Sequence, residues 1–226
     1  MLLPNRLTLM QRVQDAARNG FHGYFVGQVS LEKWEKLSLK FAREYDTDMP
    51  RSTRSKRRKA GEAVALVYAC PPPPWESSGP IHFVLLATAG AGRIHAREQL
   101  LELQRNRLEL EGYELVHDGV GWSWQMSAAR YRYWRERIHS AAARPPGQRA
   151  FHMEDGLQLD LHAEEILDAL YHAPGFRLVR RQVGKLVAYL ISEWRRLRPA
   201  NEPQPRPRGF LPYVRRLPNA KEGLDD

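Results

Sequence analysis

The sequence predicts an α+β fold, in which a βαββαβ unit with one extra strand is followed by a helical C-terminal region. Three observations predict it. Apolar residues alternate or run on without a break in short segments between residues 23 and 126, as they do in strands. Other apolar residues recur at helical spacing between and after these segments. Clusters of proline and glycine separate the elements.

The first elements follow from spacing and capping signals. We expect a short amphipathic helix over residues 6–19 and the first strand over residues 23–30. Ser30 is placed to cap the next helix. The core side of that helix carries Trp34, Leu37, Phe41 and Tyr45. A second strand covers residues 62–70 and ends at a run of prolines, which cannot donate to a strand ladder.

The third strand, residues 81–88, is apolar throughout, which is typical of a central position in a sheet. A glycine turn at residues 90–92 then leads into a predicted helix over residues 94–111. Gly112 is placed to end that helix.

A fourth strand is expected over residues 113–117, and a fifth over residues 122–126 after a turn signal. Ser127 is placed to cap a third helix. The composition changes at residues 143–147, where Ala-Arg-Pro-Pro-Gly interrupts the helical pattern, and this indicates a domain boundary.

Beyond the boundary, apolar spacing predicts helices over residues 163–172 and 178–194. The segment from Pro199 is rich in proline and arginine, and we expect it to be extended. The chain thus divides into a nucleic-acid-binding domain, a helical region and an extended basic tail. Their ranges are 1–142, 148–198 and 199–226.

The order strand–helix–strand–strand–helix–strand between Gly23 and Met126 is the split βαβ, ferredoxin-like pattern. Many small proteins that handle RNA or single-stranded DNA use this pattern. It therefore indicates a class of partner, although it does not name a reaction.

The charge of the chain points to the same partner. The 226 residues carry a formal net charge of +9, which favours polyanions, nucleic acid above all. Six of the nine residues from 51 to 59 are basic, namely Arg51, Arg54, Lys56, Arg57, Arg58 and Lys59. Such dense cations repel one another and need solvent or a polyanion, so we expect a mobile loop there that binds phosphates. The alternative is a loop that is merely solvated.

The segment after the third strand is a second candidate for anion binding. A glycine turn that opens a helix presents free backbone N–H groups, and Arg93, His95 and Arg97 lie close to it in the sequence. His95 is the candidate catalytic residue, because histidine gives and takes protons near neutral pH. The alternative is a tight turn with an exposed histidine.

Basic side chains also gather on the later helices. Arg130 and Arg132 lie on the third helix. The last two helices have the outline of a helix-turn-helix, whose second helix would carry phosphate or base contacts near its start. There the sequence places Arg177, Arg180, Arg181 and Lys185. Alternatively, the apolar stripe of that helix covers the sheet or packs on a partner protein.

Aromatic residues offer stacking faces for bases. Tyr24, Trp122 and Trp124 lie in predicted strands, where they either stack on bases or belong to the core.

Other functional classes have little support. The only cysteine, Cys70, allows neither an intrachain disulfide nor a cysteine-based zinc site, and it fits a reducing cytoplasm. The histidines lack the spacing of a zinc helix, so neither a metal nor a cofactor is predicted. A metal-dependent nickase with Tyr131 or Tyr133 as nucleophile is disfavoured. No segment indicates a secretory signal or a membrane span.

Tyr24-Phe-Val-Gly-Gln-Val29 resembles the first-strand motif of RNA-recognition domains, although residues 82–88 lack the basic residue, glycine and spaced aromatics of that family's third strand. The order of elements, the basic run and the basic helical appendage resemble the ferredoxin-like proteins of CRISPR effector complexes, some of which cleave or cap the guide RNA. The resemblance rests on architecture. In cleavage of that kind a histidine or tyrosine and an arginine hold the 2′-hydroxyl and the phosphate, and the nearest counterparts are His95, Arg93 and Arg97.

We therefore expect a cytoplasmic protein that binds RNA or single-stranded DNA through phosphate contacts, as a subunit of a CRISPR-type or mobile-element ribonucleoprotein. Two alternatives remain open. One is a metal-independent endoribonuclease that processes guide RNA. The other is an accessory protein of plasmid replication or transfer that acts through other protein subunits.

Overall fold

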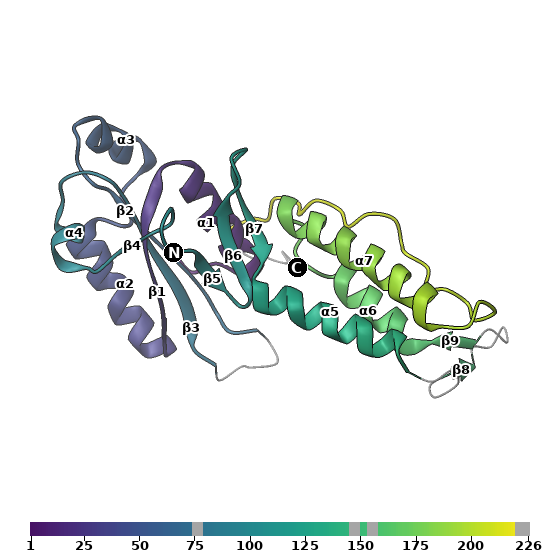
Figure 1. Cartoon of the computed structure of the whole chain (residues 1–226). Coiled ribbons are helices and arrows are strands. Elements are labelled where there is room, and N and C mark those ends of the chain that lie inside the picture. Colours follow the sequence, from purple (N-terminus) through teal and green to yellow (C-terminus); the bar gives the residue numbers. More distant parts are fainter. Residues whose placement is uncertain (74–78, 145–149, 153–157, 220–226) are drawn as a thin grey trace. The chain divides into compact units, whose positions relative to one another are not determined.

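The computed structural model in Figure 1 describes residues 1–73, 79–144, 150–152 and 158–219. It is a mixed α+β structure with antiparallel sheets. Its residues divide into two compact units. The first contains Met1–Leu110, Leu115–Ser123 and Arg215–Asp226. The second contains Glu111–Glu114 and Trp124–Val214.

The first unit is built around a four-stranded sheet in the order β2-β3-β1-β4. The strands are β1 (Phe21–Val29), β2 (Ala65–Cys70), β3 (Ile81–Thr88) and β4 (Leu101–Glu102). β3 pairs antiparallel with β1 and β2, and β1 pairs antiparallel with β4. The first three predicted strands are confirmed, and so is the central position of the apolar third strand.

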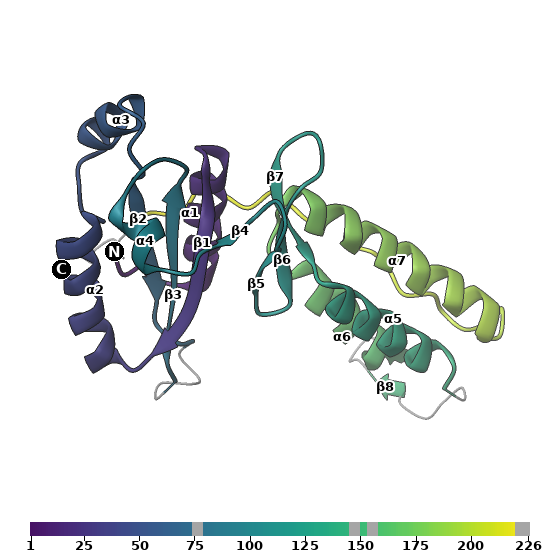
Figure 2. The ribbon, with the colours of Figure 1, turned by 60° about the vertical axis from the view of Figure 1, so that its left-hand side comes forward.

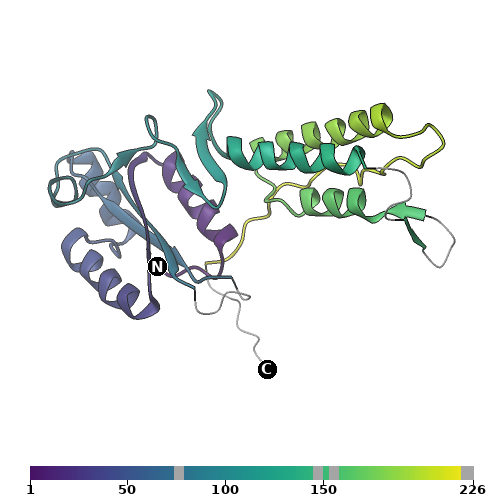
Figure 3. The same ribbon diagram turned by 60° about the horizontal axis from the view of Figure 1, so that its bottom comes forward.

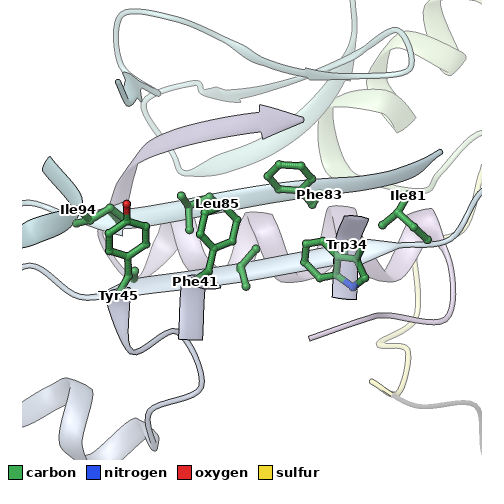
Figure 4. Close-up of a cluster of buried hydrophobic side chains, with 11 residues drawn as sticks. Trp34, Phe41, Tyr45, Ile81, Phe83, Leu85 and Ile94 are labelled. Carbon is green, nitrogen blue, oxygen red and sulfur yellow. The ribbon is translucent and has the colours of Figure 1, made fainter. Parts of the chain in front are cut away.

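Helix α2 (Leu31–Tyr45) covers one face of this sheet. It begins at the predicted cap, where the Ser30 hydroxyl accepts a hydrogen bond from the Lys33 N–H. Trp34, Phe41 and Tyr45 are buried against residues of β2 and β3 (Figure 4). Fully burying an apolar side chain of this size stabilises a fold by ~1.5–3 kcal/mol, so the predicted core side of α2 anchors the helix.

Helix α1 (Arg6–Arg18) covers the opposite face, as Figures 2 and 3 show. Alternate residues of a strand point to opposite faces. The face toward α2 carries Ala65, Val67 and the other residues of the cluster in Figure 4. The face toward α1 buries Leu66, Val84 and Leu86. The central part of the sheet is therefore covered on both sides.

The helix predicted over residues 94–111 is wrong. The structure has the short helix α4 (Arg93–Arg97), then β4, then β5 (Leu108–Leu110). Glu111 and Gly112 both have positive φ angles, of 46° and 76°, which suits a tight two-residue connection between strands. Gly112 therefore turns the chain from β5 into β6 and does not end a helix.

The strands predicted at residues 113–117 and 122–126 are confirmed as β6 (Tyr113–His117) and β7 (Trp122–Met126). They lie in a separate three-stranded sheet, in the order β5-β6-β7. The fourth strand of the larger sheet is β4 instead. Its two residues carry too little alternation to be recognised in the sequence.

The basic run forms a helix, α3 (Arg51–Lys59), so the predicted mobile loop is wrong. Arginine and lysine are good helix formers, and their charges near the C-terminal end of a helix interact favourably with its dipole. None of the α3 residues is buried. The exposed cations of α3 face water, and the half-buried Arg54 and Arg57 bind nearby oxygen atoms, so the repulsion that argued against a folded run is weakened.

The second unit contains α5 (Ala128–Ala142), α6 (Leu161–Tyr171) and α7 (Arg177–Leu197), together with the antiparallel pair β8 (Ala150–His152) and β9 (Gln158–Asp160). The three predicted helices are confirmed, and Ser127 caps α5 as expected. The apolar stripe of α7 packs within this unit, where α7 contacts α5 and α6. Part of the predicted boundary at residues 143–147 lies outside the described residues.

Residues 199–219 contain no helix or strand, in agreement with the predicted extended tail. Hydrogen bonds nevertheless hold this segment in place. The Trp194 indole N–H donates to the Pro203 carbonyl at 3.1 Å, and the Val214 N–H donates to the Gly175 carbonyl at 3.0 Å. From Arg215 onward the chain belongs to the first unit.

Candidate nucleic-acid interface

The first unit contains a cleft of about 770 Å³ that is lined by α1, α3 and β2, which we call the α1–α3 cleft. Its charged side chains are five cations and one carboxylate. The cations are Arg51, Arg54, Arg58, Lys59 and Arg216, and the carboxylate is Asp15. This excess of positive charge in a hollow surface is suited to an anionic ligand.

Helix α3 supplies most of this charge because of its spacing. Residues three and four apart share one side of a helix, and the residues that line the cleft are spaced in this way. They are Arg51, Arg54, Ser55, Arg58 and Lys59. Lys56 and Arg57 do not line the cleft. Four of the six predicted phosphate-binding residues of the basic run thus lie together.

Arg57 forms ion pairs with two carboxylates, one from the segment before α3 and one from the segment after it. Its guanidinium lies 2.7 Å from Asp46 and 3.3 Å from Glu62. These pairs connect α3 to the segments before and after it. The Arg54 guanidinium donates to the Met49 carbonyl at 2.6 Å, so it also fixes the start of the helix.

The inner part of the cleft is apolar and aromatic. Phe21 and Leu66 are buried, and Tyr68 is half-buried on the edge strand β2. The Arg58 guanidinium lies 5.8 Å from the centre of the Phe21 ring, within the range of a cation–π contact. Burial raises the pKa of Tyr68, and the charge of Arg54 opposes this effect. The phenol therefore stays neutral at physiological pH.

Sequence reasoning missed Tyr68, Phe21 and Arg216 as members of a site. Phe21 and Tyr68 resemble ordinary strand residues in the sequence. Arg216 was recognised only as part of a basic tail, and its position depends on contacts with α1, which lies some two hundred residues earlier in the chain.

Two buried side chains of α1 hold the segment that carries Arg216. Gln11 donates to the Arg215 carbonyl at 2.6 Å and accepts from the Leu217 N–H at 3.0 Å. Arg12 donates to the Leu217 carbonyl and to the Asn219 side chain. Arg216 itself lies 2.7 Å from Asp15, so the one carboxylate of the cleft is neutralised by an ion pair.

The predicted second site, around His95, has a different geometry. The His95 ring is exposed, and its Nε2 donates to the Thr88 carbonyl at 2.8 Å. Arg97 forms an ion pair with Glu44. Arg93 lines a smaller hollow of about 340 Å³ in which acidic and basic side chains alternate. The catalytic role of His95 remains a prediction.

The glycine turn before His95 has a structural explanation. A Cβ atom on Gly90 would lie 2.6 Å from the Gly61 carbonyl oxygen, so only glycine fits. The Ala91 N–H donates to the Gly61 carbonyl at 3.1 Å, and the Ala63 N–H donates to the Ala91 carbonyl at 2.9 Å. The turn is therefore fastened to the segment before β2. With only five residues, α4 also lacks the length of the helix that was expected to bind an anion.

The remaining predicted phosphate-binding residues belong to the second unit. Arg130 lies 4.5 Å from the centre of the Tyr113 ring and donates to the Glu111 carbonyl at 3.1 Å. Arg180 donates to the Leu211 carbonyl at 2.5 Å and lies 3.6 Å from the centre of the Tyr213 ring. Both therefore support the fold of this unit. The exposed residues of the set are Arg132, Arg181 and Lys185, whereas Arg177 is half-buried.

The aromatic residues proposed to stack on bases are in the core. Tyr24, Trp122 and Trp124 are 4%, 6% and 0% exposed. A base cannot reach these rings without unfolding, so of the two alternatives the core position is confirmed and base stacking is excluded.

Among the described residues, no group of three or more His, Cys, Asp or Glu side chains is placed to hold a metal ion. None of the helices in the described ranges combines the length and the apolar character needed to cross a membrane. Comparison of the chain with protein-family models, curated proteins and solved structures finds no match.

Proposed function

We propose that this protein binds nucleic acid through the α1–α3 cleft. The observation that carries the proposal is the cluster of five basic side chains around a single carboxylate that Arg216 already neutralises. Exposed cations at this density are stabilised by a partner that carries several negative charges. The phosphate backbone of a polynucleotide is the commonest such partner.

RNA or single-stranded DNA suits this cleft better than a duplex. The cations surround a hollow with an aromatic inner wall, and flexible strands can bend their phosphates into a hollow. A side chain that reads base edges in a major groove must be free to reach them, whereas Arg180, near the start of α7, is bound within its own unit.

The order of the larger sheet supports a ferredoxin-like assignment for the first unit. In the split βαβ arrangement each pair of strands joined by a helix is parallel and has one strand between its members. The chain order is β1-α2-α3-β2-β3-α4-β4, and apart from the additional helix α3 this order, the sheet order β2-β3-β1-β4 and the antiparallel pairings agree with that arrangement. The short α4 and β4, and helix α1 on the second face, set it apart from a regular example. A role as a subunit of a CRISPR-type or mobile-element ribonucleoprotein rests on this architecture.

The test measures the salt dependence of binding to a labelled single-stranded RNA. Arg51→Gln combined with Arg58→Gln removes two cations from the cleft. The matched control, Lys33→Gln with Lys40→Gln, removes two exposed cations from α2 in the same unit. For the cleft variant we expect weaker binding and a log–log salt slope reduced in magnitude by about 1.4, since each phosphate contact on a single strand contributes ~0.7.

The control variant should bind like the wild-type protein. Failure of the wild-type protein to bind RNA or DNA at low salt would overturn the proposal. If both double variants weakened RNA binding equally, binding would depend on the net charge of the protein and not on the cleft.

A further inference from the structure

We propose that the α1–α3 cleft takes up an unstacked base of the bound strand and not only its phosphates, so that the protein selects single strands that carry bases. This inference rests on the proposed function. It adds a second ligand group, the base, and a residue that contacts it, Tyr68.

The first step of the argument is that the cleft has two chemically different parts. Its charged residues, such as Arg51, Arg54 and Lys59, suit phosphate oxygens. Its inner wall, formed by Phe21, Leu66 and Tyr68, offers apolar and aromatic surface. Such a surface disfavours an anion, which loses its hydration there. It favours a flat heterocycle, because every base can stack on or against an aromatic ring.

The second step concerns the distance between the two parts. The Arg58 guanidinium lies 5.8 Å from the centre of the Phe21 ring, so a phosphate-binding group stands directly beside the apolar wall. Within one nucleotide, phosphate and base are separated by a single sugar. The cleft therefore offers neighbouring places for the two ends of one nucleotide.

The third step concerns space and access. At about 770 Å³ the cleft falls within the range of ~300–1,000 Å³ that is typical of pockets for small ligands, so one nucleotide fits. A base inside a duplex is paired and stacked, and bringing it into such a hollow requires unstacking it. A single strand meets this requirement at little cost.

Tyr68 is the residue in the best position to contact the base. It is half-buried, whereas Phe21 and Leu66 are almost fully buried, so it is the most exposed of the three residues that form the inner wall. Its neighbours include Arg12, Arg54, Asp15 and Arg216, which all act on its hydroxyl electrostatically. A neutral phenol in this position both stacks and forms a hydrogen bond with a base edge.

The experiment compares two strands that differ only in their bases. A short labelled oligonucleotide and an abasic strand of equal length carry the same phosphates. We expect the wild-type protein to bind the strand with bases about tenfold more tightly than the abasic strand, which is the effect expected of one stacked base. Ribose and deoxyribose versions of both strands show whether the sugar matters. A duplex of the same sequence should bind more weakly than the single strand.

Variants then assign the preference to the cleft. Tyr68→Leu should weaken binding of the strand with bases more than binding of the abasic strand, and so remove most of the difference between the two affinities. Tyr68→Phe, which keeps the ring, should retain most of the difference. The Arg51→Gln/Arg58→Gln variant should lower the affinity for the strand with bases and for the abasic strand by the same factor. Circular dichroism checks that each variant is folded.

Equal affinity of the wild-type protein for both strands would overturn the inference while leaving nucleic-acid binding intact. An unchanged preference in a folded Tyr68→Leu variant would also overturn it, because the base would then bind elsewhere. Absence of binding to either strand would overturn the proposed function itself. The wild-type comparison needs no variant, so the inference stays testable even if Tyr68→Leu does not fold.

Discussion

At the scale of single residues, whether a basic side chain is available to a ligand depends on the carboxylates near it. Arg57 has the same charge as Arg58, but Asp46 and Glu62 hold Arg57 while Arg58 lines the cleft. The sequence shows that both are basic. It does not show which one meets a carboxylate, because that depends on where the flanking segments lead. The six cations of the basic run could therefore be predicted as a group, but not which four of them line the cleft.

Gly90 offers a test of the structural role of the glycine turn. Gly90→Ala should destabilise the protein by about 1–3 kcal/mol, because the residue has a φ of 130° and the added Cβ would meet the Gly61 carbonyl. Urea denaturation measures the change in the free energy of unfolding. Gly121→Ala is the control, since a Cβ there meets nothing within 4 Å. Equal stability of the two variants would contradict the close approach seen in the structure.

At the scale of elements, prediction succeeded where several signals agreed. Helix α2 has a cap at Ser30 and buried residues at regular spacing, and α5 has the same combination. The predicted helix over residues 94–111 rested on the glycine turn before it and on Gly112 after it, without a capping side chain. Leu108 and Leu110 alternate with an exposed residue, as in a strand, and this short signal was outweighed by the longer helical one. For the basic run, charge repulsion predicts a loop and helix propensity predicts a helix, and the structure shows the helix.

The contact between α5 and α7 leads to a pH prediction. Hydrogen bonds from Arg196 and His139 lower the pKa of Glu193 from its ordinary value of 4.5 to about 2. The carboxylate therefore stabilises the folded state fully above about pH 4.5, and this contribution is lost as the pH falls toward 2. We expect thermal unfolding of the wild-type protein to shift to lower temperature across this range.

Glu193→Gln should show a smaller shift over the same pH range, because the group that titrates has been removed. Calorimetry at a series of pH values compares the two proteins. Parallel pH profiles would show that other carboxylates account for the acid sensitivity.

At the scale of the whole molecule, the fold brings segments that are about two hundred residues apart together in one site. Arg216, close to the C-terminus, lies beside Asp15 of α1 and lines the cleft with α3. Patterns over a few residues identify helices and strands, but they carry no signal for this pairing. The fold class and the basic run could be read from the sequence. The cleft could not, because it combines segments that are distant along the chain.

Arg216→Gln tests this arrangement. The change removes one cation and the 2.7 Å ion pair to Asp15, which keeps its longer contact of 3.6 Å with Arg12, so the carboxylate beside the bound strand would be less well neutralised. We expect weaker binding and a salt slope reduced in magnitude by at least about 0.7. Arg215→Gln is the control, since the exposed Arg215 contacts Gln11 through its carbonyl. If the two variants lost the same amount of binding affinity, Arg216 would not belong to the site.

The most direct test of the central claim is to map where a bound strand touches the protein. A single strand with photoreactive bases is crosslinked to the full chain at low salt, and the modified peptides are identified by mass spectrometry. The account predicts crosslinks to α3 and to Tyr68 that disappear in the Arg51→Gln/Arg58→Gln variant. Crosslinks confined to α5 or α7, or unchanged in that variant, would contradict it.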